Sequence, residues 1–171
     1  MSVLNVEIKA RCRDPDRIRA LLAERGAEFR GVDRQVDTYF HCRRGRLKLR
    51  EGNIERALIH YDRPDSPGPK PAAVTLYRPP ADPALKAALA AALGVRAIVE
   101  KRREIYFLDN VKFHIDQLDP LGTFVEIEAI DETGDADREH LHRQCREYLD
   151  LFGIRPADLV TRSYGDMVAP A

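Results

Sequence analysis

Charged and apolar side chains alternate along several short segments that lie far apart in this sequence. Residues 5–9 (NVEIK) and 124–128 (FVEIE) lie toward opposite ends of the chain, and residues 46–50 (RLKLR) place three cations at alternate positions. Successive side chains of a β-strand point to opposite faces, so each segment, as a strand, has one apolar and one charged face. The period of two therefore predicts a protein built around antiparallel strands.

Three other segments carry the period and the capping residues of helices. They run from Asp14 to Gly26, from Asp82 to Gly94 and from about Ala136 to Gly153. In the first two, an aspartate before a proline supplies the N-cap and N1 residues, and a glycine ends all three. Apolar residues recur at helical spacing on one side, so we expect each helix to cover an apolar surface.

Eight strands complete the predicted set, joined by turns or by the helices. They cover residues 3–11, 29–41, 46–50, 55–63, 74–78, 98–108, 111–118 and 123–130. The proline-rich segment 64–71 (PDSPGPKP) is predicted to be a loop. Eight strands with three amphipathic helices predict an antiparallel α+β fold whose helices pack on the outside.

The charged faces of these strands need water, ion partners or a ligand. Their charged residues are Glu7, Lys9, Lys48, Arg50, Glu126 and Glu128. Burying such ions in a dry interior costs several kcal/mol per ion. A closed or nearly closed sheet would instead give them a polar lumen, suited to a polyanion and its metal ion.

Composition limits the classes of partner. The 171 residues include 28 basic and 28 acidic side chains, so the net charge gives no reason to expect nucleic acid or a membrane surface. No apolar run approaches the roughly 20 residues that span a bilayer, and no secretory signal is visible. The three cysteines (Cys12, Cys42 and Cys145) are far apart, which is typical of a reducing cytoplasm. We expect one cytoplasmic domain over residues 1–171.

Further motifs follow along the chain in a fixed order. They are 61–64 (YDRP) leading into 68–70 (GPK), 101–103 (KRR), 114–116 (HID), 122–128 (GTFVEIE) and 163–167 (SYGDM). Their order and spacing resemble the CYTH superfamily, or triphosphate tunnel metalloenzymes, which includes class IV adenylyl cyclases, thiamine triphosphatases and inorganic triphosphatases. The family's Glu-x-Glu-x-Lys motif is matched by Glu7 and Lys9, with Asn5 in place of the first glutamate. The layout is most similar to the bacterial class IV adenylyl cyclase-like branch.

The resemblance implies an eight-stranded antiparallel β-barrel whose tunnel binds a linear triphosphate with Mg²⁺ or Mn²⁺. Lysine and arginine side chains suit phosphate oxygens. The candidate phosphate ligands are Lys9, Lys48, Arg50, Arg63, Arg78, Lys101 and Arg103. Hard divalent cations take carboxylate oxygens. The candidate metal ligands are Glu7, Glu126, Glu128 and Asp116.

Two candidate catalytic residues follow from the same resemblance. Lys9 resembles a lysine that orients or deprotonates the nucleophile, and Asp116 would position a metal ion or a water molecule. The amide at Asn5 removes one negative charge from the first strand. This departure puts the number of metal ions, one or two, in question more than the class of ligand.

Simpler interpretations apply to single features. Alternation on any one strand is also typical of a half-solvated antiparallel sheet, although less so for all the strands together. RNA binding is disfavoured, because the chain has no tryptophan and only 7% aromatic residues to stack on bases. His114 is interpreted as a hydrogen-bonded wall residue, Tyr164 as a packing residue and Lys70 as a solvated loop lysine.

Three functions remain open from the sequence. Hydrolysis of a phosphoanhydride bond is preferred, because it needs no nucleobase pocket. The alternatives are cyclisation of ATP to cyclic AMP and pyrophosphate, and non-catalytic binding of polyphosphate or nucleotides. The expected partner is a small-molecule triphosphate or nucleotide, and an exposed strand or helix face would allow a homodimer, as in resembling cyclases.

Overall fold

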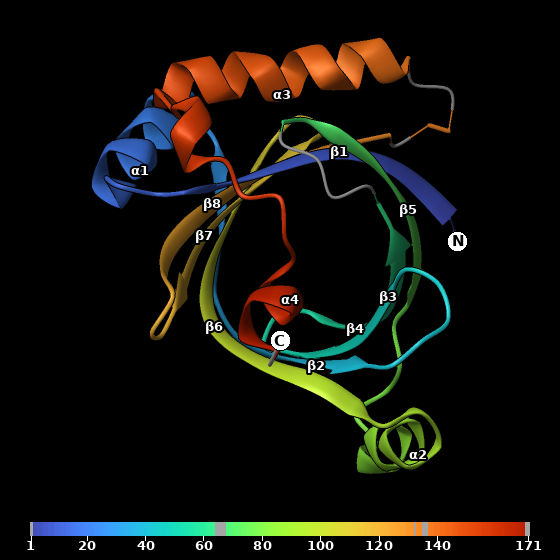
Figure 1. Ribbon diagram of the computed structural model, residues 1–171. Coiled ribbons are helices and arrows are strands. Elements are labelled where there is room, and N and C mark those ends of the chain that lie inside the picture. Colours follow the sequence, from blue (N-terminus) through green and yellow to red (C-terminus); the bar gives the residue numbers. More distant parts are fainter. Residues whose placement is uncertain (1, 64–67, 132, 135–136, 170–171) are drawn as a thin grey trace.

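A closed barrel of eight strands forms the centre of the computed structural model (Figure 1). The structure describes residues 2–63, 68–131, 133–134 and 137–169. The strands are β1 Ser2–Arg11, β2 Glu28–Phe40, β3 Arg46–Glu51, β4 Arg56–Asp62, β5 Lys70–Tyr77, β6 Val95–Leu108, β7 Val111–Leu118 and β8 Gly122–Ile130. They follow the order β1-β5-β4-β3-β2-β6-β7-β8, every pairing is antiparallel, and β8 pairs with β1 to close the barrel. The predicted antiparallel barrel is confirmed.

The strand register places opposite charges side by side inside the barrel. Lys9 of β1 pairs with Glu126 of β8, and Arg103 of β6 pairs with Asp116 of β7. Directly paired residues in antiparallel strands have their side chains on the same face. On β1 and β8 the alternation seen in the sequence therefore becomes a charged inner face, with Lys9 and Glu126, and an apolar outer face, with Ile8 and Ile127.

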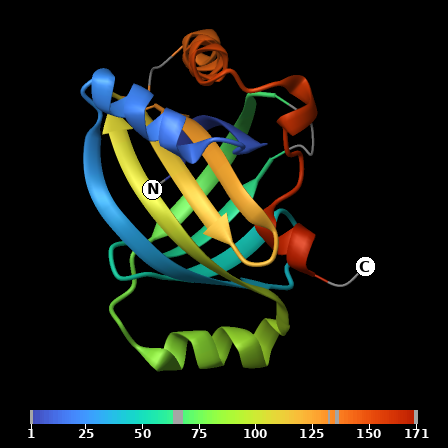
Figure 2. The same cartoon turned by 90° about the vertical axis from the view of Figure 1, so that its left-hand side faces the viewer.

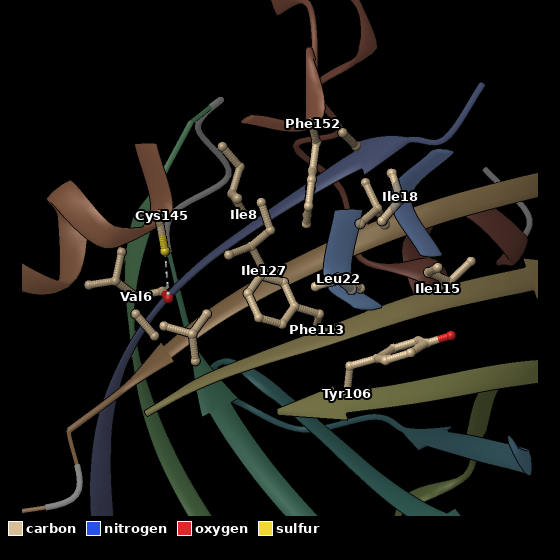
Figure 3. Packing of buried hydrophobic residues seen from close by; sticks show 14 of the residues in the cluster. Val6, Ile8, Ile18, Leu22, Tyr106, Phe113, Ile115, Ile127, Cys145 and Phe152 are labelled. Carbon is tan, nitrogen blue, oxygen red and sulfur yellow. Dashed lines mark hydrogen bonds between the residues drawn. The ribbon is translucent and has the colours of Figure 1, made fainter. Parts of the chain in front are cut away.

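Two helices cover the apolar outer surface near β1, β7 and β8. The helices are α1 Pro15–Glu24, α2 Pro83–Leu93, α3 Arg138–Phe152 and α4 Tyr164–Val168, with a 3₁₀ turn η1 at Pro156–Asp158. Leu22 of α1 and Phe152 of α3 pack against Phe113 and Ile127 of the barrel (Figure 3). No helix in the described part of the chain is long and apolar enough to cross a membrane.

Helix α2 covers less apolar surface than the sequence predicts. It lies outside the barrel against β2, and Lys86 donates to Glu51 of β3 at 2.8 Å. None of its residues is buried, and Leu93 is 39% exposed. The helix lies apart from the other helices, at one end of the barrel (Figure 2), and its leucines stay partly open to solvent.

The strand ends differ from the prediction where a neighbouring strand offers partners. β5 begins at Lys70, and Pro71 pairs with Val6 of β1, so the last two residues of the predicted 64–71 loop belong to a strand. Residues 64–67 of that loop lie outside the described residues. β6 begins at Val95 instead of Ile98, because the long β2 pairs with it as far as Phe40. Pairing partners from distant segments therefore set these ends.

The short helix α4, which the sequence did not predict, packs at one end of the barrel (Figures 1 and 2). Tyr164 stacks edge-on against Phe124 with ring centroids 5.3 Å apart. Asp166 accepts hydrogen bonds from Arg46 at 2.7 Å and from Arg96 at 2.6 Å. A Cβ added to Gly165 would lie 2.8 Å from the Tyr39 ring, so the backbone approaches the barrel closely there. Helix α4 thus covers this barrel end.

Glu104 is a buried carboxylate on the outer surface of β6, away from the lumen. It accepts hydrogen bonds from Arg19 at 2.9 and 2.8 Å, from Arg102 at 2.9 Å and from Tyr106 at 2.9 Å. Burial opposes its charged form, but these donors outweigh burial and lower the pKa of Glu104 to about 2. The carboxylate therefore anchors α1 to the barrel.

Glu104→Gln is expected to flatten the acid limb of the stability curve. Because the folded-state pKa of about 2 lies below the ordinary 4.5, Glu104 stabilises the fold above pH 4.5 and loses this contribution as pH falls toward 2. The loss is on the order of 1 to 3 kcal/mol. Urea unfolding of both proteins between about pH 2 and 6 measures it. Wild-type and variant curves that fall in parallel would contradict the assigned role.

Candidate functional site

The lumen of the barrel holds a cavity of about 660 Å³ whose wall mixes both signs of charge. Its ionic lining residues are Glu7, Lys9, Lys48, Arg50, Glu55, Arg56, Arg63, Arg78, Arg103, Lys112, Glu126 and Glu128. Most of them come from strands that the sequence separates widely, where the period of two turns their side chains inward, whereas Glu55, Arg63 and Arg78 lie just beyond strand ends. A wall of this composition can hold a polyanion and a cation together.

One part of the wall is organised around Asp37, a fully buried residue of β2. It accepts from Lys48 at 3.1 Å, from Arg50 at 2.9 Å through two nitrogens, and from Lys101 at 2.7 Å. Burial alone would raise the pKa of Asp37, but the three cations outweigh it and hold that pKa well below its usual range. Asp37 is therefore an ionised carboxylate shared by three cations.

A second group of ion pairs centres on Arg103. Its Nε and Nη2 donate to the two oxygens of Asp116 at 2.6 Å each, and Nη2 also donates to Glu126 at 2.8 Å. The Tyr164 hydroxyl donates to Asp116 at 2.7 Å, which connects α4 to the same group. This two-pronged geometry fixes the plane of the guanidinium against the cavity wall.

Lys9 lies between the carboxylates and helix α4. Its Nζ is 3.4 Å from an oxygen of Glu126 and 3.6 Å from the centre of the Tyr164 ring. Burial lowers the pKa of Lys9, although the charge of Glu126 opposes the shift. A lysine whose pKa is lowered releases its proton more readily, so Lys9 is suited to exchange a proton inside the cavity.

Glu7 and Glu128 are directly paired on the neighbouring strands β1 and β8. Arg63 donates to Glu7, and the amide of Asn5 donates to Glu128. Burial, and then the charges of Glu7 and Glu126, raise the pKa of Glu128 to about 7 despite the opposing charge of Lys112. Negative charge is thus crowded at Glu128, and an added cation would relieve that crowding.

Comparison with known protein families bears on this site. A family model for the CYTH domain matches residues 4–164. The chain belongs to the CYTH family. CYTH enzymes are triphosphatases or adenylyl cyclases and depend on divalent cations. No curated protein matches the sequence.

Solved structures share the CYTH barrel at low sequence identity. A protein from Pyrococcus horikoshii is 22% identical with a TM-score of 0.80, over 96% of this chain and 99% of that chain. A candidate adenylate cyclase from Vibrio parahaemolyticus is 21% identical with a TM-score of 0.70, over 96% and 97%. A candidate adenylyl cyclase from Hippeastrum, with a dominant triphosphatase activity, is 13% identical with a TM-score of 0.59, over 94% and 91%. These likenesses support the fold.

The donor set of this CYTH chain fits a divalent cation. Glu7, Glu126 and Glu128 supply hard oxygens to one cavity, and the buried Oδ1 of Asn5 has no hydrogen-bond partner among the described residues. Within the same described ranges, no three His, Cys, Asp or Glu side chains converge as a ready-made metal site. Glu7 is held instead by Arg63, Glu126 by Lys9 and Arg103, and Glu128 by the amide of Asn5, so metal binding would require these carboxylates to turn.

Most of the candidate site residues expected from the CYTH resemblance lie on the cavity wall. These are Glu7, Lys9, Lys48, Arg50, Arg63, Arg78, Arg103, Glu126 and Glu128. Arg78 follows the end of β5 and is exposed. Lys101 and Asp116 are buried behind the described cavity wall and contact it through Asp37 and Arg103. Lys101 and Asp116 therefore lie deeper in the barrel wall than the other candidates, which reach the cavity surface.

Several polar residues of the CYTH site were not singled out from the sequence. Asp37 gathers three cations, and Glu55 accepts from Arg50 at 3.1 Å and from Lys112. The inward parity of β2 could have found Asp37, and Lys112 shares the parity of His114 on β7. His114, taken from the sequence as a hydrogen-bonded wall residue, lines the cavity with Nδ1 3.1 Å from Glu126.

Proposed function

We propose that this CYTH protein binds a linear triphosphate in its barrel cavity and hydrolyses a phosphoanhydride bond with Mg²⁺ or Mn²⁺. The observation that carries the proposal is the convergence of many cations and four glutamates on one cavity wall inside a closed barrel. A surface ion-pair network would need no such enclosed convergence. A triphosphate with its metal ion carries both kinds of charge that this wall complements.

The cations of the wall would bind and orient the phosphates. Arg50 and Arg103 line the cavity and are held in fixed planes by Asp37 and Asp116, which do not line it. Lys48, on the same strand as Arg50, and Arg63, just after the end of β4, add positive charge to the wall. Fixed donors stabilise charge on phosphoryl oxygens without reorganising during the reaction.

The carboxylate side of the cavity would support attack by water. A divalent cation bound to the glutamates supplies Lewis-acid stabilisation of phosphoryl charge. Lys9, with its lowered pKa, would orient the attacking water or accept its proton. Asp116 would act through Arg103, which it holds by two hydrogen bonds of 2.6 Å. In this scheme the arginines and Lys48 bind the phosphates, while Lys9 activates the water that attacks.

Cyclisation of ATP is the second candidate, and an apolar part of the wall favours it. Ile54, Ile59, Leu76, Phe107 and Ile130 line the same cavity as the charged residues. Inorganic triphosphate has no apolar surface to place there, whereas a nucleoside has. A class IV cyclase reaction would need this region to hold adenosine while the ribose 3′-hydroxyl attacks the α-phosphorus.

Product analysis separates these functions. Purified protein is incubated with tripolyphosphate or ATP, with Mg²⁺, Mn²⁺ or EDTA. Metal-dependent release of orthophosphate would support hydrolysis, whereas cyclic AMP with stoichiometric pyrophosphate would support the cyclase. Tight calorimetric binding of tripolyphosphate without either product would contradict an enzyme and leave a non-catalytic binder.

A further inference from the structure

Asp37 lies at the centre of a cationic cluster that holds two cavity-lining residues. Its Oδ2 accepts from Lys48 Nζ at 3.1 Å, Arg50 Nη2 at 2.9 Å and Lys101 Nζ at 2.7 Å, while Oδ1 accepts from Arg50 Nε at 2.9 Å. Lys48 and Arg50 line the cavity, whereas Asp37 does not belong to the described wall. Asp37 thus contacts the site only through its cations.

The contacts of Asp37 fix which edge of Arg50 faces the cavity. Asp37 takes the Nε and Nη2 edge of the guanidinium, so Nη1 points away from it and donates to Glu55 at 3.1 Å. Glu55 also accepts from Lys112, which lines the same cavity. One acidic group therefore already bridges Arg50 and Lys112 at a place that a phosphate oxygen would suit.

The charges around Asp37 explain why these cations need a common anchor. Lys48, Arg50 and Lys101 share one carboxylate, and the side chain of Lys101 is completely buried. Without Asp37 the like charges would repel, and the flexible Lys48 and Arg50 side chains would leave their present geometry. One negative charge among three cations still leaves the cluster net positive, so it can attract a polyanion.

We propose that Asp37 is a positioning residue for the triphosphate: it holds Lys48 and Arg50 ready for the phosphates before the substrate arrives. The proposal rests on the proposed function and gives Lys101 a role as well. Lys101 donates to Oδ2 of Asp37, the oxygen that Lys48 and Arg50 also contact, and balances its charge without reaching the cavity. Binding is then favoured because the two cations lose little freedom on contact with phosphate.

Two variants test this positioning role, and the second of them preserves the net charge of the protein. Asp37→Asn removes the anchor, and Asp37→Asn combined with Lys101→Met removes one negative and one positive charge together. The double variant avoids leaving Lys101 buried without a counterion, so it keeps the test open if the single variant does not fold. Glu104→Gln is the matched control, since it also removes a buried carboxylate held by arginines, but on the outer surface of the barrel.

The measurement is calorimetric affinity for tripolyphosphate without metal, with circular dichroism to show that each variant is folded. We expect the dissociation constant of both Asp37 variants to rise at least about tenfold, with KM rising more than kcat falls, and the Glu104→Gln constant to stay at the wild-type value. A folded double variant that binds as tightly as wild type would show that only net charge matters and would overturn the proposal. Wild-type binding without turnover would defeat the proposed hydrolysis alone, whereas no wild-type binding would defeat both.

Discussion

Replacing Glu126 with glutamine is expected to lower metal-dependent turnover of tripolyphosphate at least about a hundredfold while the barrel stays folded. Glu126 lies on the cavity wall and contacts Lys9 at 3.4 Å, Arg103 at 2.8 Å and His114 at 3.1 Å. Glutamine keeps the size of the side chain and one acceptor oxygen, so Arg103 retains a partner. It removes the negative charge that a divalent cation needs, which is why the loss should fall on metal use.

Glu126→Gln should lower metal-dependent turnover without weakening metal-free binding of tripolyphosphate. Turnover is followed against Mg²⁺ or Mn²⁺ concentration, and metal-free binding of tripolyphosphate is measured by calorimetry. Because the substitution removes a negative charge next to a polyanion site, metal-free affinity should not weaken. Glu104→Gln should change neither quantity. A Glu126→Gln protein with wild-type metal dependence would exclude Glu126 as a ligand.

Replacing Arg103 with methionine is expected to cost about 3 to 5 kcal/mol of unfolding free energy. Arg103 is buried and satisfies both oxygens of the fully buried Asp116 at 2.6 Å. Methionine would leave that carboxylate with the hydroxyl of Tyr164 as its remaining partner among the described side chains. The cost arises from an uncompensated buried charge, so removing the charge should recover part of it.

A double-mutant cycle measures this coupling. Arg103→Met, Asp116→Asn and the combined variant are unfolded with urea at neutral pH. The combined variant should be more stable than Arg103→Met alone, because the asparagine needs no counterion. The ion-pair assignment would be contradicted if the combined variant lost as much unfolding free energy as the two single variants together. An Arg103→Met protein as stable as wild type would also contradict it.

Strand parity predicts the inner face of this barrel well, because it depends on neighbouring residues in the chain. Glu7 and Lys9 could be assigned to one face without knowing what lies beside them, and the structure places both on the cavity wall. The apolar positions Ile8 and Ile127 pack in the cluster that α1 and α3 cover, as expected (Figure 3). Local alternation was enough for these residues, since a strand leaves each side chain only two faces.

Strand parity could not predict which inward-facing side chains reach the cavity surface and which are buried behind it. Lys101 and Asp116 have the expected inward parity, yet both are buried behind residues that reach the cavity. Their depth depends on which strands pair with β6 and β7 and in which register, and this is tertiary information. Helix α4 is a similar case: it is five residues long, and its contacts with Arg46 and Arg96 come from distant strands.

The most direct test of the proposed site is a crystal structure of the wild-type protein with tripolyphosphate and Mn²⁺, using the anomalous signal of manganese. We expect the triphosphate inside the barrel, with its oxygens on Arg50, Arg63 and Arg103, and the manganese peak bound by Glu126 and Glu128. Tripolyphosphate bound on the outer surface, with Glu126 and Glu128 still contacting only groups of the protein, would contradict the central claim.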